Sequence, residues 1–155
     1  KEVGGGRIIG EACHFIDLLR YLIGHRIVDI QAAMIGQSPG LSVRDDKMTI
    51  TLSFADGSIG TIHYFANGHR SFPKERVEVF CAGKILALDN FKALKGYGWP
   101  HFRKMILWNQ DKGHRNSVRA FINAIEQNLP SPIPADEIFE VTRVTFDIMD
   151  KVVKS

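Results

Sequence analysis

The sequence predicts an α+β fold in which helices cover one face of a mostly antiparallel β-sheet. Residues 8–23 have apolar side chains at helical spacing, residues 27–108 contain a run of strand patterns joined by turns, and residues 118–152 return to helical spacing. Because strands and helices are segregated along the chain, a doubly wound parallel sheet is disfavoured. We expect a single domain over residues 1–155, with the other face of the sheet available for dimerisation.

The first helix follows a glycine triplet and carries the main candidate site. Its apolar residues recur at the i, i+3 and i+4 spacing, at Ile8, Ile9, Ala12, Cys13, Ile16, Leu19 and Ile23. Arg7, Glu11 and His14 are four and three residues apart, which predicts one shared helix face, and Asp17 follows His14 by three residues. Ionisable groups on a mostly buried helix need partners, a ligand or water, so these four are candidate site residues.

The middle of the chain predicts antiparallel hairpins. Residues 48–54 alternate apolar and Thr or Ser side chains, and the Ala-Asp-Gly-Ser turn signal at 55–58 predicts a return strand over 59–65. The threonine face of this hairpin must then meet water, another domain or a second subunit. The remaining predicted strands cover residues 27–35, 76–81, 85–88, 91–94 and 102–108, and residues 36–43 are a predicted loop.

Two helices are predicted at the C-terminal end. The first has an amphipathic stripe and ends at the proline-rich residues 129–134, because proline interrupts a helix. The last begins near Asp136 and Glu137, where acidic side chains favour the helix dipole. Its predicted buried face consists of Ile138, Thr142, Thr145, Phe146, Met149 and Val152.

Composition and charge exclude several classes of function. The chain has 155 residues and a net charge of +3, and it contains no apolar run of the ~18 residues that a membrane span needs. Its basic residues are scattered among acidic ones, which disfavours nucleic-acid binding. We interpret Cys13 and Cys81 as buried thiols and the N-terminal residues as lacking a signal peptide, which predicts a cytoplasmic protein.

The short motifs do not by themselves identify a catalytic or metal site. The glycines at 4–6 lack dinucleotide-loop spacing and follow no strand, which favours a hinge or a close-packing turn. The Glu11-x-x-His14 pair has no second copy, as a di-iron site would need, so we expect no metal site. Taken alone, His14 is either a structural histidine or a group able to transfer protons to a hydroxyl or carbonyl.

Several ordered motifs resemble one enzyme family. The segment GGGRIIGEACHFIDLLRYLIG is similar to the start of the C-terminal domain of Gfo/Idh/MocA (glucose-fructose oxidoreductase and inositol dehydrogenase-like) dehydrogenases, with His14, Asp17 and Gly24 at matching positions. FADGSIGTIHYFANG, FPKERVEVFCAG and DKGHRNSVRAFINAIEQNLPSPIPADEIFEVT extend the resemblance over nearly the whole chain. More narrowly, they resemble members that are fused to an alcohol-dehydrogenase-like region and linked to polysaccharide biosynthesis.

The resemblance implies a substrate-binding and oligomerisation domain of a longer enzyme. In such enzymes NAD or NADP is bound mainly by an N-terminal Rossmann domain, and a sugar, nucleotide-sugar or cyclitol hydroxyl is oxidised. It implies that His14 is catalytic, and that this chain alone is inactive. Glu11, Asp17 and Arg7 would contact the carbohydrate substrate, and Asn67 and Lys74 fall in the region that borders it in relatives.

One position departs from the family pattern. Many relatives have an aspartate four residues before the histidine, where this chain has Gly10 followed by Glu11. On a helix, Glu11 is rotated by about 100° from that position. The alternative hypothesis is therefore a non-catalytic interaction or dimerisation domain with a degenerate site.

Overall fold

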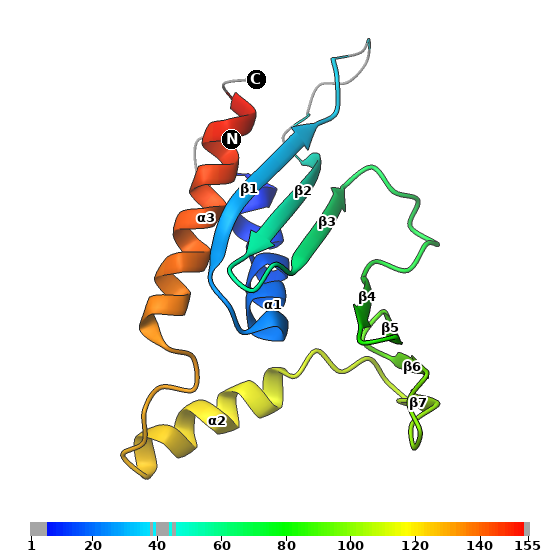
Figure 1. Ribbon diagram of the computed structural model, residues 1–155, viewed down its shortest axis with the longest axis vertical. Helices are drawn as coiled ribbons and strands as arrows, with labels where there is room; N and C mark the ends of the chain where they lie inside the picture. The colour runs from blue at the N-terminus through cyan, green and yellow to red at the C-terminus, as the bar shows by residue number, and fades with distance from the viewer. Residues whose placement is uncertain (1–5, 38, 40–43, 45, 154–155) are drawn as a thin grey trace. The chain divides into compact units, whose positions relative to one another are not determined.

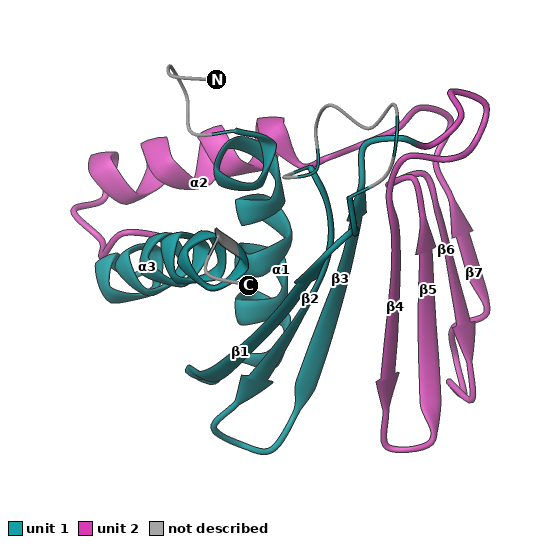
Figure 2. Ribbon diagram, turned by 90° about the horizontal axis from the view of Figure 1, so that it is seen from above, with its two compact units in different colours: residues 1–67, 133–155 teal, residues 68–132 magenta. Residues whose placement is uncertain are grey.

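The computed structural model of the chain describes residues 6–37, 39, 44 and 46–153 and contains helices and two antiparallel sheets (Figure 1). This confirms the predicted α+β class. The chain groups into two compact units: unit 1 comprises Lys1–Asn67 and Ile133–Ser155, and unit 2 comprises Gly68–Pro132 (Figure 2). The assignment of all 155 residues to one domain stays a prediction, and each unit is described by itself.

Unit 1 contains a three-stranded sheet with the order β1-β2-β3. The strands are β1 (Ile27–Met34), β2 (Lys47–Phe54) and β3 (Ile59–Phe65), and both pairs are antiparallel. The predicted alternation in β2 is confirmed, because its apolar side chains at 48, 50, 52 and 54 are buried. At the β2–β3 turn, Gly57 has a φ of 87°, which favours glycine, and Asp56 accepts hydrogen bonds from the Ser58 amide and hydroxyl.

One face of this sheet is covered by helices (Figure 2). A π-helical segment η1 (Ile8–Ala12) leads into α1 (Cys13–Ile23), and α3 (Ala135–Val153) packs beside α1 and β1. The sequence predicted an ordinary α-helix from Ile8, and the π-helical turn is a departure from it. The helix α1 ends at Gly24, as a glycine after the last apolar residue of a helix predicts, because Gly24 has a φ of 75° and its amide bonds to the Arg20 carbonyl. The core joins helix and strand residues, namely Ile8, Ala12, Ile16, Ile30, Met48, Ile50, Leu52, Phe54, Ile62, Val141, Val144, Ile148 and Val152.

The predicted buried face of α3 is partly wrong. Ile138 and Phe146 are 47% and 52% exposed, and Thr142 is also exposed. Only Thr145, Met149 and Val152 of the predicted set turn inward, fully or in part. The observed buried face consists of Glu140, Val141, Val144, Thr145, Ile148 and Val152. Glu140 on this face is turned inward and accepts a hydrogen bond from the buried Arg20 of α1.

Unit 2 contains a four-stranded sheet with the order β4-β5-β6-β7, followed by the helix α2 (His114–Glu126). Its strands are β4 (Arg76–Cys81), β5 (Lys84–Asp89), β6 (Ala93–Tyr97) and β7 (Lys104–Ile106). The sequence placed the third strand at 91–94 and the fourth at 102–108. The third begins later because Asn90 and Phe91, both with a φ of 49°, form the β5–β6 turn.

The two cysteines are more exposed than the sequence predicted. Cys81 is exposed at the end of β4 and Cys13 is half-buried on α1, so the interpretation of both as buried thiols is wrong. Partial burial still raises the pKa of the Cys13 thiol, because it disfavours the thiolate. Among the helices of the described residues, none has the length and apolar character that crossing a membrane requires.

Candidate functional site

The predicted catalytic residue lies near the start of α1. His14 is exposed in the first turn of the helix, and Asp17, one turn later, is half-buried. Neither side chain forms a hydrogen bond or an ion pair with another residue that the structure describes. An exposed imidazole with no protein partner is free to receive a hydrogen-bonding ligand.

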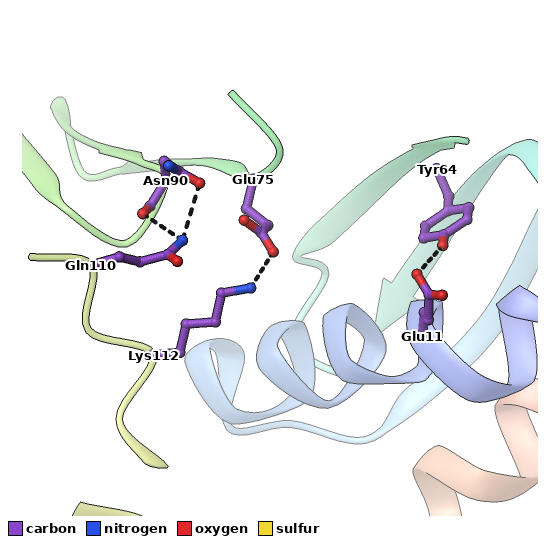
Figure 3. Close-up of polar contacts among 6 residues, drawn as sticks. All are labelled: Glu11, Tyr64, Glu75, Asn90, Gln110 and Lys112. Carbon is purple, nitrogen blue, oxygen red and sulfur yellow. Dashed lines mark hydrogen bonds and ion pairs between the residues drawn. The ribbon is translucent and has the colours of Figure 1, made fainter. Parts of the chain in front are cut away.

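Glu11 contacts the sheet. The Tyr64 hydroxyl on β3 donates a 2.5 Å hydrogen bond to Oε2 of Glu11 (Figure 3). Partial burial, then this hydrogen bond and the charge of Glu11, raise the pKa of Tyr64 to about 12. The charge of Arg7 acts in the opposite sense. The structure therefore joins Glu11 on the helical segment to Tyr64 on the sheet.

The π-helical turn changes the expected side-chain spacing. The amide of Cys13 bonds to the carbonyl of Ile8, five residues earlier, in place of the α-helical four. The prediction of one face for Arg7, Glu11 and His14 assumed α-helical rotation throughout, which does not hold across this turn. As a result Glu11 binds Tyr64, and no described contact joins Glu11 to His14.

A buried ion-pair network fixes α1 against α3. Nε of Arg20 is 3.1 Å from Oε2 of Glu140, and a terminal guanidinium nitrogen is 3.3 Å from Oε1 of Glu137. The other oxygen of Glu140 accepts a 2.7 Å hydrogen bond from the amide of Ile27, at the start of β1. Sequence reasoning missed this network. An arginine among apolar residues of a mostly buried helix was the available signal, because a buried charge requires a partner.

Asn67 and Lys74, the two further predicted contacts, lie in different units. Asn67 is exposed near the end of the unit 1 sheet, and Lys74 is exposed in the segment before β4 of unit 2. Lys74 lines a cleft of about 590 Å³ that lies wholly within unit 2. Arg70, Ser71, Phe72 and Pro73, from the same predicted loop as Lys74, also line this cleft. Sequence reasoning missed the other lining residues, which are Glu75, Asp89, Asn90, Lys92, Ala93, Ile106, Gln110 and Lys112.

Two further histidines, His63 and His69, have hydrogen-bonding partners in the structure. Nδ1 of His63 is 3.1 Å from the Thr49 hydroxyl, and Nδ1 of His69 is 2.8 Å from the Ser71 hydroxyl. Within the described residues, no three His, Cys, Asp or Glu side chains are grouped so that they could hold a metal ion.

The sequence matches one family model over residues 1–86, that of the GFO/IDH/MocA C-terminal domain. The chain belongs to this family. The matched residues include η1, α1 and the whole unit 1 sheet, and therefore His14, Glu11 and Tyr64.

Solved structures share the fold of this GFO/IDH/MocA domain. UDP-N-acetylglucosamine 3-dehydrogenase GnnA from Acidithiobacillus ferrooxidans is 18% identical with a TM-score of 0.73, over 90% of this chain and 45% of that chain. The dehydrogenase MviM from Clostridium difficile is 20% identical with a TM-score of 0.73, over 96% and 48%. The WlbA dehydrogenase from Bordetella pertussis, solved with NADH and UDP-GlcNAcA, is 17% identical with a TM-score of 0.55, over 93% and 41%.

The extent of these matches limits what they show. This GFO/IDH/MocA domain spans less than half the length of each of these three dehydrogenases. No curated protein sequence matches the chain. At identities of 17–20% the structural likeness shows the fold, and the activity of the complete protein is therefore a proposal.

Proposed function

We propose that the chain is the substrate-binding and oligomerisation domain of an NAD(P)-dependent oxidoreductase that acts on a sugar, nucleotide-sugar or cyclitol hydroxyl. Membership of the GFO/IDH/MocA family supports this proposal, because its structural neighbours are named as dehydrogenases. The observation that carries it is the exposed His14 at the start of α1, with no partner among the described residues. The proposal includes a cytoplasmic location, a link to polysaccharide biosynthesis and fusion to an alcohol-dehydrogenase-like region.

In this proposal His14 moves a proton. A neutral imidazole nitrogen accepts the proton of the substrate hydroxyl during oxidation and returns it during reduction, because imidazole gains and loses a proton near neutral pH. Glu11, Asp17 and Arg7, on the same helical segment, contact neighbouring polar groups of the substrate. Tyr64 fixes the position of Glu11 through its hydrogen bond, so this carboxylate needs little ordering when substrate binds.

The described residues of this chain do not fit a dinucleotide site. All strand pairs in both sheets are antiparallel, and η1 follows no described strand, whereas a dinucleotide loop connects a parallel strand to a helix. We therefore propose that NAD or NADP is bound mainly by a separate Rossmann domain of the complete enzyme. The cofactor there would accept or supply the hydride, and this chain alone would be inactive.

The unit 1 sheet supports the proposed homo-oligomer. Its second face carries polar side chains on the two neighbouring strands β2 and β3, including Thr49, Thr51 and Thr61. Ile59 and Phe65 at the two ends of β3 are 71% and 51% exposed, which adds apolar area to this face. An exposed face of mixed polar and apolar character fits association with a second copy of the sheet.

The decisive experiment is the His14→Ala substitution in the full-length enzyme. Rates of NAD(P) reduction with a panel of sugars and UDP-sugars should fall by about a hundredfold or more if His14 is the general acid–base. His25→Ala, an exposed histidine just after α1, is the matched control and should leave the rate unchanged. Unchanged turnover in His14→Ala, with a native circular dichroism spectrum, would contradict the catalytic role.

A second candidate is a non-catalytic interaction domain with a degenerate site. It is favoured by the absence of a carboxylate at Gly10 and by the engagement of Glu11 with Tyr64, since together they leave His14 without an acidic partner in the described residues. Under this hypothesis the full-length protein still forms a dimer, as measured by sedimentation equilibrium, but neither His14 substitution nor substrate addition changes NAD(P) turnover.

A further inference from the structure

The cleft of unit 2 has a preorganised wall built from three separate segments. The amide of Asn90, in the β5–β6 turn, donates a 2.7 Å hydrogen bond to the carbonyl of Glu75, just before β4. The amide of Asp111, after β7, bonds to the carbonyl of Phe91, and Nε2 of Gln110 donates to both the carbonyl and Oδ1 of Asn90 (Figure 3). Segments far apart in the sequence are therefore held around one cleft before any ligand arrives.

The turn at the centre of this wall has an unfavourable backbone conformation. Asn90 and Phe91 both have a φ of 49° in the three-residue connection between the paired residues Asp89 and Ala93, and the Lys92 amide bonds to the Asp89 carbonyl. Glycine is the favoured second residue of such turns, and a bulky residue there costs of order 1 kcal/mol or more. Phe91 is kept in place by the Lys112 ammonium, which lies 5.7 Å from its ring centroid. Local strain of this kind is concentrated at functional sites.

Lys112 is also held by an ion pair with Glu75 (Figure 3). Oε1 of Glu75 accepts a hydrogen bond from the Lys112 ammonium, while Oε2 is buried and has no hydrogen-bond partner among the described residues. A buried acceptor without a partner lowers stability. This pair is therefore better explained by a role in positioning Lys112 at the cleft than by a contribution to folding.

Three further cations line the cleft without a carboxylate partner. Arg70, Lys74 and Lys92 form no ion pair with any residue that the structure describes, and all three are exposed. Together with Lys112 the cleft is lined by four cations but only two carboxylates, Glu75 and Asp89. Glu75 is already paired with Lys112. Like charges around one cleft repel each other, so an anion placed among them relieves that repulsion.

We propose that this cleft binds an anionic group of a small-molecule ligand, a phosphate or a carboxylate, through Arg70, Lys74 and Lys92. The identity of the ligand rests on the proposed function: if the protein acts on sugars, the ligand of this cleft is an acidic or phosphorylated sugar. The cleft has a volume of about 590 Å³, which suits a ligand larger than a single ion. Phe72 and Ile106, 70% and 56% exposed, supply an apolar wall for the rest of the molecule.

The test is isothermal titration calorimetry of the full-length protein with two anionic probes and their neutral counterparts. UDP-glucose tests the phosphate and D-glucuronate the carboxylate, with uridine and D-glucose as neutral comparisons. We expect saturable binding of at least one anionic probe, weakening as salt rises, and none of the neutral compounds. Lys74→Gln and Lys92→Gln should each raise the dissociation constant of the anionic probe that binds by about tenfold, because a charge-assisted hydrogen bond is lost.

Lys95→Gln is the matched control. Lys95 is an exposed lysine on β6 that does not line the cleft, so its substitution should leave the dissociation constant unchanged. Absence of binding by both anionic probes, or equal weakening by Lys95→Gln and Lys74→Gln, would overturn the proposal.

Titration of the His14→Ala protein separates this proposal from the proposed function. Intact anion binding together with unchanged turnover in that variant refutes the role of His14 and supports the cleft. Loss of turnover in that variant together with absent anion binding refutes the cleft and leaves the role of His14 standing.

Discussion

Unit 1 and unit 2 are both antiparallel sheets accompanied by helices, but they bury their apolar residues very differently. Unit 1 encloses a continuous core between one face of its sheet and the helices α1 and α3. Among the buried hydrophobic residues of the described chain, only Ala124 belongs to unit 2. The apolar stripe of α2 illustrates the contrast, since Val118, Phe121, Ile122 and Ile125 are 46–65% exposed.

The polar contacts differ in the same way. In unit 1 the pair of Arg20 and Glu140 is buried and connects three elements. In unit 2 the pair of Arg76 and Glu78 is exposed on one strand, and the pair of Lys112 and Glu75 is only partly buried. The chemistry of unit 2 is concentrated in its cleft, where cations outnumber carboxylates. Unit 1 is therefore a well-packed unit with a buried core. Unit 2 buries few apolar residues, and its charged surface is suited to binding a ligand.

The largest expected effect tests the buried ion pair. Glu140→Ala leaves Arg20 buried beside Glu137 alone and removes the acceptor of the Ile27 amide, so unfolding free energy should fall by about 3–5 kcal/mol. Glu78→Ala, which breaks the exposed pair of unit 2, should cost less than about 1 kcal/mol. Urea unfolding followed by circular dichroism measures both, and equal losses would contradict the contrast between the units.

Truncation of one leucine in each sheet compares the cores directly. Leu52→Ala removes a fully buried side chain in the centre of β2 and should destabilise the protein by about 3 kcal/mol. Leu86→Ala, at a half-buried position of β5, should cost about 1 kcal/mol, because less area leaves the interior. Hydrogen exchange of the β2 and β5 amides reports each unit separately. A greater loss from Leu86→Ala would show that unit 2 has a substantial core.

The contact between Glu11 and Tyr64 should give a smaller effect with a pH signature. Tyr64→Phe removes one hydrogen bond and should cost about 1 kcal/mol at neutral pH. Because the pKa of Tyr64 is raised from 10.0 to about 12, its stabilising contribution is fully present below pH 10 and is lost as pH rises towards 12.

Ultraviolet titration of the phenolate measures this shift. The latest-titrating tyrosine should disappear in Tyr64→Phe and persist in Tyr97→Phe, the control in unit 2. If the latest-titrating tyrosine is still observed in Tyr64→Phe, the contact between Tyr64 and Glu11 is refuted.

The smallest expected effect concerns Gly10, the position where the family resemblance led us to expect an aspartate. A Cβ at Gly10 meets nothing within 4 Å, so Gly10→Asp should change stability by less than about 1 kcal/mol. The control is Gly60→Asp, whose Cβ would lie 2.7 Å from Cδ1 of Leu19 and which should therefore be more destabilising. Thermal unfolding of both variants makes the comparison, and a Gly10→Asp loss as large as that of Gly60→Asp would contradict the open space at Gly10.

The sequence by itself determined the features that depend on neighbouring residues. The alternation of residues 48–54 identified β2 and its buried face, and the turn signal at 55–58 identified the hairpin to β3. Gly24 marked the end of α1. These features follow from side-chain periodicity and backbone preferences, which act over a few residues and are therefore legible in the sequence.

The tertiary structure decided the features that join distant parts of the chain. Arg20 and Glu140 are 120 residues apart, and Glu140 lies on a buried face of α3 that periodicity had not predicted. Glu11, in the π-helical turn, accepts a hydrogen bond from Tyr64 on the sheet, whereas its spacing had predicted a helix face shared with Arg7 and His14. The unit 2 cleft likewise depends on hydrogen bonds among three separate segments. No local pattern encodes such contacts, because a buried charge requires a partner but does not specify where in the chain that partner lies.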